Sequence, residues 1–200
     1  MDNKSSDSVN QLDPSAKAVP LLEARGLVKA FSGTVAVNGV DIEIYPGDVI
    51  AIVGENGAGK TTLKNLLIGL LSPDKGTIKL QGQNIAHFHA SELGIAAVHQ
   101  EFSLFPSLSV AENVCIVDLP GRGLFVNWPE TYRTAKKYLD MISANLDLDR
   151  PVEKLSTGEQ QLVEIAKALR QATKILILDE PTTSLTKPER ERLFDVIMRL

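Results

Sequence analysis

The sequence predicts an α/β fold with a largely parallel sheet, preceded by a small antiparallel β subdomain and interrupted by a helical insertion. Two short apolar runs, Asp48–Val53 and Ile175–Leu178, have the composition of buried strands, and each is followed by polar residues and then a helical pattern. Helical periodicity dominates between them, from about residue 101 to 170. Because strands that alternate with helices form parallel sheets, we expect ligands to bind beyond the carboxyl ends of these two strands.

The first part of the chain predicts a tail and a strand pair. Residues 1–20 are rich in Ser, Asp, Asn and Lys and lack the apolar run of a secretion signal. We therefore expect a disordered tail there and one folded domain over residues 21–200. Leu21–Phe31 and Val40–Tyr45 carry short apolar runs separated by a turn-like segment, which predicts two antiparallel strands.

The next segment predicts a strand, a glycine-rich loop and a helix. Asp48–Val53 is mostly apolar and β-branched and lies between two glycines, the pattern of a strand buried on both faces. From Lys60 the period changes to that of a helix, which Ser72–Pro73 is expected to end. The apolar face of this helix consists of Leu63, Leu66, Leu67 and Leu70.

The rest of the sequence predicts further strands, a helical insertion and a last helix. Gly76–Leu80 and Ile95–Val98 are further strand candidates, and Ile175–Leu178 is ended by Asp179-Glu-Pro, because proline cannot continue a central ladder. Two apolar stripes mark the helical insertion: Ala135, Leu139, Ile142 and Leu146, then Leu162, Ile165, Ala166 and Leu169. A last helix begins at Thr186 and Glu189, which have capping-box spacing. We expect its apolar face to be uncovered: Leu193, Val196, Ile197 and Leu200.

Composition narrows the class of protein. With 44% hydrophobic and 23% charged residues the chain is not disordered as a whole, and its net charge of -4 argues against a protein that grips nucleic acid. The single cysteine, Cys115, cannot form an internal disulfide, which indicates a reducing compartment. No run approaches the ~20 apolar residues that span a bilayer, so we expect any membrane association to be peripheral or through a partner.

The strongest motif is the loop from Gly54 to Thr62, which satisfies G-x-x-x-x-G-K-[ST] between a predicted strand and a predicted helix. Its backbone N–H groups and the helix N-terminus would cradle phosphates, Lys60 would bridge the β- and γ-phosphates, and the Thr61 hydroxyl would bind Mg²⁺. The alternative is a glycine-rich connector. The predicted ATP-binding residues of the loop are Gly54, Glu55, Asn56, Gly57, Ala58, Gly59, Lys60, Thr61 and Thr62.

A second motif ends the strand Ile175–Leu178. An acidic residue after a buried apolar strand is costly unless a cation or donors satisfy it, so Asp179 is predicted to hold Mg²⁺. The neighbouring Glu180 is predicted to polarise the attacking water as general base. The alternative is an ordinary carboxylate pair at a strand-to-turn junction.

The segment Leu155–Gln161, followed by Leu162–Leu169, resembles the signature motif of ATP-binding-cassette (ABC) transporter ATPases, which have a P-loop NTPase (RecA-like) core. The resemblance implies that Ser156, Thr157, Gly158 and Glu159 contact ATP held by the P-loop of a second cassette, so that two cassettes enclose two ATP molecules. The local alternative is that Ser156 and Glu159 only cap the following helix, although both roles use the same helix end.

Further matches and departures refine the resemblance. Gln100 is similar to a glutamine that contacts Mg²⁺ and water, Phe31 to an aromatic that stacks on adenine, and Ser184–Thr186 to a loop at the dimer interface. Thr157 replaces a glycine, Glu159 a glutamine and Thr186 an aspartate, as in ribose-, xylose-, arabinose- and galactose-type importers. A carboxylate would repel a γ-phosphate, so we expect Glu159 to turn back onto backbone N–H groups.

The resemblance implies a subunit that uses ATP and Mg²⁺ to power sugar import. The implied partners are a second cassette, membrane permease subunits and, indirectly, a periplasmic sugar-binding protein, with no nucleic acid; the implied location is the cytoplasmic face of the inner membrane. No histidine follows Glu180, although the family has one there, so we expect these 200 residues alone to be the N-terminal part of a first cassette with little ATPase activity and poor solubility. The alternative is a soluble ABC ATPase acting on nucleic acid or ribosomes.

Overall fold

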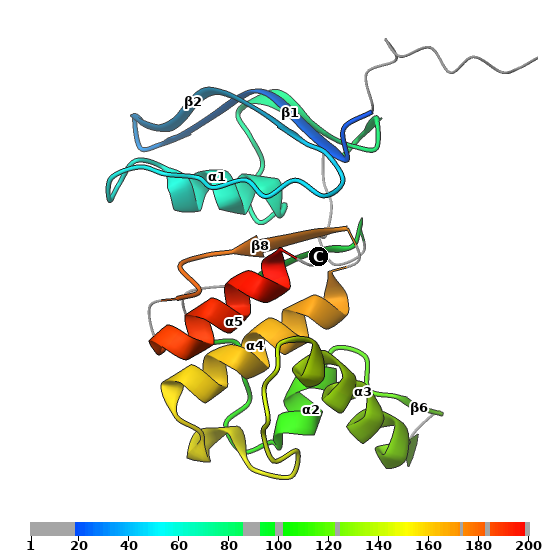
Figure 1. The fold of residues 1–200 in the computed structure, drawn as a ribbon. Helices are drawn as coiled ribbons and strands as arrows, with labels where there is room; N and C mark the ends of the chain where they lie inside the picture. The colour runs from blue at the N-terminus through cyan, green and yellow to red at the C-terminus, as the bar shows by residue number, and fades with distance from the viewer. Residues whose placement is uncertain are drawn as a thin grey trace, which may run out of the picture.

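The computed structural model describes residues 19–85, 93–98, 102–122, 125–172, 174–182 and 185–198. They form an upper half, in which a curved antiparallel sheet covers helix α1, and a lower half, in which helices lie below a short parallel sheet (Figure 1). The N-terminal part of the chain forms the upper half and the C-terminal part the lower one. The combination of a β subdomain, a parallel sheet and a helical part agrees with the predicted α/β class, but in the described residues the parallel sheet has only two strands, β5 (Ile95–Val98) and β8 (Ile175–Leu178).

The antiparallel sheet has the strand order β2-β1-β3-β4. Its strands are β1 (Leu22–Phe31), β2 (Thr34–Ile44), β3 (Lys75–Leu80) and β4 (Gln83–Asn84). Ser32 and Gly33, both with positive φ, form the two-residue turn between β1 and β2, a turn whose twist suits a hairpin. The predicted strand pair is confirmed, but β2 begins at Thr34 and not at Val40, because this tight turn leaves the segment before Val40 free to pair with β1.

Helix α1 (Lys60–Leu67) packs beneath this sheet. Leu63, Leu66 and Leu67 are buried in one core with side chains of β1 and β3, as the helical pattern predicts. Leu70 is 64% exposed, which contradicts its predicted place on this face. The helix ends at Leu67 and turns at Gly69, where φ is 74°, so Leu70 no longer follows the helical period.

The predicted buried strand Asp48–Val53 is not present. These residues form an irregular connection between β2 and α1, and Val53 is 91% exposed. A parallel strand needs a ladder partner and covered faces, and in the described part of the chain β5 (Ile95–Val98) and β8 (Ile175–Leu178) pair only with each other. Apolar composition alone therefore did not make this segment a strand.

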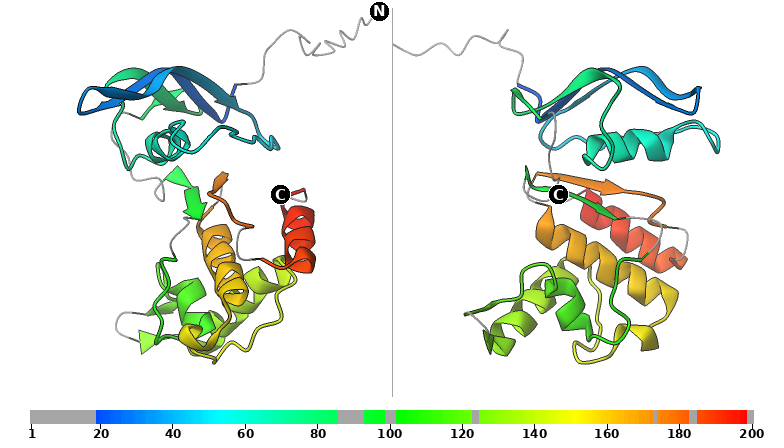
Figure 2. Two further views of the ribbon diagram at one scale, coloured as in Figure 1. Left: turned by 90° about the vertical axis from the view of Figure 1, so that its left-hand side faces the viewer. Right: turned by 180° about the vertical axis from the view of Figure 1, so that it is seen from behind.

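Strands β5 and β8 are parallel, with Ile95 opposite Ile175 and Val98 opposite Leu178. Their side chains alternate between two cores. Ile95 and Ile175 pack into the core that contains α1, whereas Ala96, Val98, Leu176 and Leu178 pack into the helical core. The β5–β8 sheet is thus a layer between the two halves, which agrees with the predicted burial of the second strand on both faces (Figures 1 and 2).

The helical core is built from α2 (Val110–Cys115), α3 (Trp128–Met141), α4 (Thr157–Gln171) and α5 (Lys187–Ile197). Short elements between them are β6 (Gly121–Arg122), β7 (Phe125–Val126) and the 3-10 turn η2 (Val152–Lys154). Both predicted apolar stripes pack into this core: Ala135, Leu139, Ile142, Leu146, Leu162, Ile165, Ala166 and Leu169. None of the helices in the described part of the chain combines the length and the apolar character needed to cross a bilayer.

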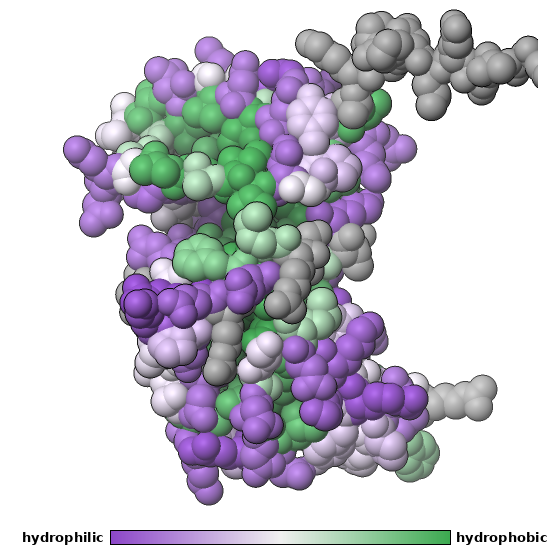
Figure 3. All heavy atoms as spheres, viewed as in Figure 1, coloured by the Kyte–Doolittle hydropathy of each residue, from purple (hydrophilic) through white to green (hydrophobic). Residues whose placement is uncertain are grey.

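Helix α5 begins as predicted, because the backbone N–H and the hydroxyl of Thr186 donate to Glu189 Oε2 at 2.8 and 2.7 Å. The expectation that its apolar face is uncovered is wrong for Leu193 and Val196. Both are buried, in the core that contains Ala96 and Val98 of β5. On the face of the molecule shown in Figure 3, apolar and strongly polar surfaces lie side by side.

Candidate nucleotide-binding site

The predicted phosphate loop leads directly into α1. Gly57 and Gly59 have φ values of 84° and 85°, in the left-handed region that favours glycine. A Cβ atom on Gly59 would lie 2.1 Å from the carbonyl oxygen of Ala36 on β2, so the close approach of two backbones requires glycine there. The first turn of α1 contains no acidic residue, which leaves the positive end of the helix suited to an anion.

Lys60 folds back over this loop. Its ammonium group donates to the carbonyl oxygens of Gly54 and Glu55 at 2.8 and 2.9 Å. These contacts hold one positive charge beside the glycine turns and at the start of α1, where a phosphate would find both the charge and the helix N-terminus. Thr61 follows on the first turn and is exposed.

The acidic pair at the end of β8 has two different environments. The N–H of Asp179 donates to the carbonyl of Val98 at 3.1 Å, which extends the β5–β8 ladder by one bond. Asp179 Oδ2 accepts from Lys64 Nζ at 2.7 Å, and these side chains are 26% and 10% exposed. Glu180 is exposed and has a φ of 47°, a left-handed conformation that is unfavourable for glutamate and is often found at functional sites.

Lys64 is the site residue that sequence reasoning missed. It lies on α1, one turn after Lys60, and its ion pair with Asp179 joins the loop-bearing helix to the acidic strand end. A signal was present: Lys64 follows Leu63 and precedes Leu67 by three residues, so it borders the apolar face of α1 and needs an acidic partner when buried.

The predicted signature residues form the N-terminus of α4. The N–H of Ser156 donates to Glu159 Oε2 at 2.7 Å, and the N–H of Glu159 donates to Ser156 Oγ at 3.3 Å, a complete capping box. The hydrogen bond from the Ser156 backbone, with smaller effects from its hydroxyl and from Arg150, holds the pKa of Glu159 below its usual range. The expectation that Glu159 turns back onto the backbone is confirmed.

The predicted signature residues, Ser156–Glu159, do not lie near the phosphate loop Gly54–Thr62 of the same chain. The N-terminal end of α4, in yellow, is the end of this helix that lies away from α1 and the β5–β8 sheet (Figures 1 and 2). Two predicted site residues, Gln100 and Ser184, lie outside the described residues.

Phe31 is 46% exposed at the end of β1, with Lys29 Nζ 5.8 Å from its ring centre. It is accessible to a ligand, and its contact with adenine stays a prediction.

A polar cluster connects α4 to the segment before α2; its members Lys167 and Glu164 are buried and Ser103 is exposed. Lys167 Nζ donates to the backbone and side-chain oxygens of Ser103 at 2.8 and 2.7 Å and lies 3.8 Å from Glu164 Oε1, which accepts from the Ser103 hydroxyl. Burial lowers the pKa of Lys167, an effect that the charge of Glu164 opposes. This cluster joins the signature helix to residues that closely follow Gln100, and the motif analysis did not find it.

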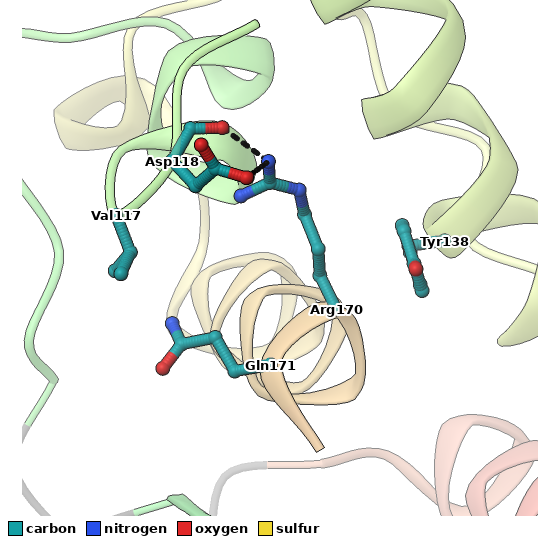
Figure 4. Close-up of a pocket in the computed structure, with 5 residues that line it drawn as sticks. All are labelled: Val117, Asp118, Tyr138, Arg170 and Gln171. Atoms are coloured by element: carbon teal, nitrogen blue, oxygen red, sulfur yellow. Dashed lines mark hydrogen bonds and ion pairs between the residues drawn. The ribbon is translucent and has the colours of Figure 1, made fainter. Parts of the chain in front are cut away.

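A surface pocket of about 390 Å³ lies elsewhere, between α2, α3 and the end of α4 (Figure 4). It is lined by Val117, Asp118, Tyr138, Arg170 and Gln171. The Arg170 guanidinium donates to the carboxylate of Asp118 at 3.3 Å, which neutralises its charge. The pocket contains no motif residue, so it is separate from the nucleotide site.

Fold and site together define a nucleotide-binding cassette, in which a glycine-rich loop and an acidic strand end meet at α1. Residues 37–183 match the ABC transporter family. The chain belongs to the ABC transporter ATPase family.

Several curated relatives carry sugar-import names. The ribose import ATP-binding protein RbsA 3 of Rubrobacter xylanophilus is 46% identical over 90% of this chain and 37% of its own length. The arabinose import ATP-binding protein AraG of Mannheimia succiniciproducens is 39% identical over 91% of this chain and 37% of its own length. The chain thus spans little more than a third of these relatives.

Solved structures agree with the fold. An ATP-binding cassette of an ABC transporter superposes with a TM-score of 0.79 at 28% identity, covering 90% of this chain and 76% of the other. A dimeric cassette in a post-hydrolysis state, bound to ADP and phosphate, superposes with a TM-score of 0.76 at 26% identity, covering 88% and 81%.

Proposed function

We propose that this chain binds ATP at the loop Gly54–Thr62 and forms part of an ATPase that powers sugar import. The observation that carries the proposal is the convergence at α1: left-handed glycines, the Lys60 ammonium and the open helix N-terminus on one side, and the carboxylate of Asp179 on the other. We assign residues 21–200 to one nucleotide-binding domain, with residues 101–170 as its helical subdomain, because the β5–β8 layer packs into both cores.

The residues at this position suit Mg²⁺. Thr61 offers a hydroxyl and Asp179 a carboxylate, and Gln100 is assigned here from the sequence resemblance alone and would add an amide oxygen. Hydroxyl, carboxylate and amide oxygens are the hard ligands that Mg²⁺ prefers beside phosphate oxygens. A cation, the Lys64 ammonium, already lies 2.7 Å from Asp179, so the carboxylate is placed to bind positive charge. When bound, Mg²⁺ would neutralise charge on the β- and γ-phosphates.

The protein groups perform the remaining steps. Lys60 releases the carbonyls of Gly54 and Glu55 and binds the β- and γ-phosphates, while the loop N–H groups orient them. Glu180 accepts a proton from the water that attacks the γ-phosphate, a role for which its exposed carboxylate next to Asp179 is suited. Phe31 stacks on the adenine through its ring face.

Ser156–Glu159 acts on ATP in another cassette. The distance between this helix end and α1 in the fold supports contact in trans, and the solved relative that is described as dimeric binds ADP and phosphate. The names of the relatives support a permease and a periplasmic sugar-binding protein as partners and a peripheral position on the cytoplasmic face of the membrane. They do not favour the alternative of an ABC ATPase acting on nucleic acid or ribosomes.

The test has two parts. Calorimetry with a non-hydrolysable ATP analogue and Mg²⁺ is expected to show one binding site on this chain. The complete protein, reconstituted in vesicles with its permease and binding protein, is expected to couple ATP hydrolysis to ribose or arabinose uptake. Absence of nucleotide binding would overturn the site assignment, and nucleotide hydrolysis stimulated by RNA but not by sugar would favour the alternative.

A further inference from the structure

Lys64 is an unusual residue for the buried side of a helix. Its side chain is 10% exposed, and its neighbours Leu63 and Leu67 belong to the core under the antiparallel sheet. A lysine at such a position needs a paired charge, because burial without one destabilises the ammonium form. The structure provides Asp179, 115 positions further along the chain, at 2.7 Å.

Asp179 also needs a partner of opposite charge. It follows the apolar strand β8, and its side chain is 26% exposed. A carboxylate in that position is stabilised by a nearby cation, and the structure supplies one from α1. The ion pair therefore satisfies the lysine and the aspartate at once.

The same carboxylate is assigned to Mg²⁺ under the proposed function, on which this inference rests. An ammonium group at hydrogen-bond distance repels a divalent cation that approaches the same carboxylate. Lys60, the other ammonium on this part of α1, is directed to the carbonyls of Gly54 and Glu55. Lys64 is thus the cation placed to compete at Asp179.

We propose that Lys64 is a positioning residue that substitutes for the metal at Asp179 while the site is empty and yields the carboxylate when the metal–nucleotide complex binds. The exchange keeps the carboxylate of Asp179 paired with a cation and oriented in both states. It also lowers the affinity of the empty site for free divalent cations, so that the metal enters with the nucleotide.

The first test measures metal affinity. Mn²⁺ is titrated into this chain in the presence of a non-hydrolysable ATP analogue and followed by electron paramagnetic resonance. Lys64→Met removes the competing charge, so Mn²⁺ is expected to bind on the order of tenfold more tightly than to the wild type. Lys64→Arg keeps a cation and is expected to show no tightening. Lys137→Met, an exposed helical lysine on α3, is the control for net charge.

The second test measures the ion pair without ligand. Thermal unfolding of the wild type, Lys64→Met, Asp179→Asn and the double variant forms a cycle. In the absence of nucleotide, each single variant is expected to melt several degrees below the wild type. The loss in melting temperature of the double variant is expected to be smaller than the sum of the two single losses. Additive losses would overturn the proposed pairing.

The outcomes separate this inference from the proposed function. If the wild type does not bind the ATP analogue, the proposed function and the role of Lys64 are both overturned. If the wild type binds the analogue with Mn²⁺ but folded Lys64→Met binds the metal equally or more weakly, only the role of Lys64 is overturned. If circular dichroism shows that Lys64→Met does not fold, Lys64→Gln takes its place in the metal titration, with the same expected tightening and the same contradicting result.

Discussion

At the scale of single residues, we propose different roles for Lys60 and Glu180, the first in nucleotide binding and the second in hydrolysis. Lys60 lies on the phosphate loop and is held by two backbone carbonyls, whereas Glu180 is exposed after the strand end with a left-handed backbone. The position of Lys60 suits a role in the affinity for nucleotide, and the position of Glu180 suits a role in the rate of hydrolysis. Substitutions at the two residues should therefore affect different measurements.

Lys60→Ala removes the point charge beside the glycine turns. We expect MgATP binding to weaken by about tenfold or more, because a charge-assisted contact with the phosphates is lost. Calorimetry on the wild type and variant measures this difference. Lys137→Ala, on the exposed side of α3, should bind as the wild type does. Equal affinities for Lys60→Ala and Lys137→Ala would exclude the assignment of Lys60.

Glu180→Gln, made in the complete protein, keeps the shape of the side chain but removes the proton acceptor. ATP is expected to remain bound while turnover slows by roughly 10² or more, because a general base contributes at that level. Single-turnover phosphate release and nucleotide retention distinguish the two effects. Unchanged turnover would assign the base role to another group.

At the scale of elements, helix α4 is stabilised at its start by the Ser156–Glu159 capping box and in its middle by the polar cluster of Lys167, Glu164 and Ser103. The first is local and involves residues three positions apart, and the second brings Ser103 to Lys167 across 64 positions. Each makes a separate prediction about stability.

The cap of α4 depends on pH. The folded-state pKa of Glu159 is lowered from its usual value of 4.5, so the carboxylate contributes stability that is present above that value and is lost as the pH falls through the folded-state pKa. Between about pH 6 and about pH 3, the wild type should therefore lose more unfolding free energy than Glu159→Gln. Urea unfolding across this pH range measures the unfolding free energy of the wild type and of Glu159→Gln. The control is Glu153→Gln, at an exposed position, which should show the same pH dependence as the wild type.

The polar cluster predicts a large effect at Lys167. Lys167→Met leaves Glu164 and Ser103 without their cation, and we expect a loss of ~3 kcal/mol in the free energy of unfolding. The double variant Lys167→Met/Glu164→Leu should recover part of that loss, because no buried charge remains. The matched control is Lys187→Met on α5, whose side chain is 82% exposed. A loss at Lys167 no larger than at Lys187 would contradict the structural role of the cluster.

At the scale of the whole molecule, the β5–β8 sheet connects the two cores, because Ile95 and Ile175 face one and Ala96 and Leu178 face the other. The halves should therefore unfold together. The single tryptophan, Trp128, lies on α3 in the helical half and reports only on that half.

Leu66→Ala tests this coupling from the opposite core. Leu66 is fully buried against the antiparallel sheet, and its truncation should cost ~2–5 kcal/mol. If the two cores unfold as one, the unfolding midpoint reported by Trp128 fluorescence falls as much as the midpoint from circular dichroism. Leu70→Ala, at an exposed position, should change neither. A separate, unshifted tryptophan transition would show two independent units.

Much of the local structure was predictable. The β1–β2 pair, β5, β8, the capping boxes of α4 and α5 and the orientation of Glu159 follow from hydrophobic period, turn residues and side chains three positions apart. The extent of β2 was missed because a two-residue turn at Ser32 and Gly33 replaced the longer turn that the composition suggested. The site motifs were predictable because each is contiguous in the chain.

By itself the sequence determined the nucleotide motifs, the α/β class and the caps, since these depend on neighbours within a few positions. Only the tertiary structure decided that Asp48–Val53 has no ladder partner, that Leu193 and Val196 are buried, and that Lys64 pairs with Asp179. The physical reason is that ladder bonds, burial and buried ion pairs require two distant segments to meet, and a single segment carries one half of each such contact.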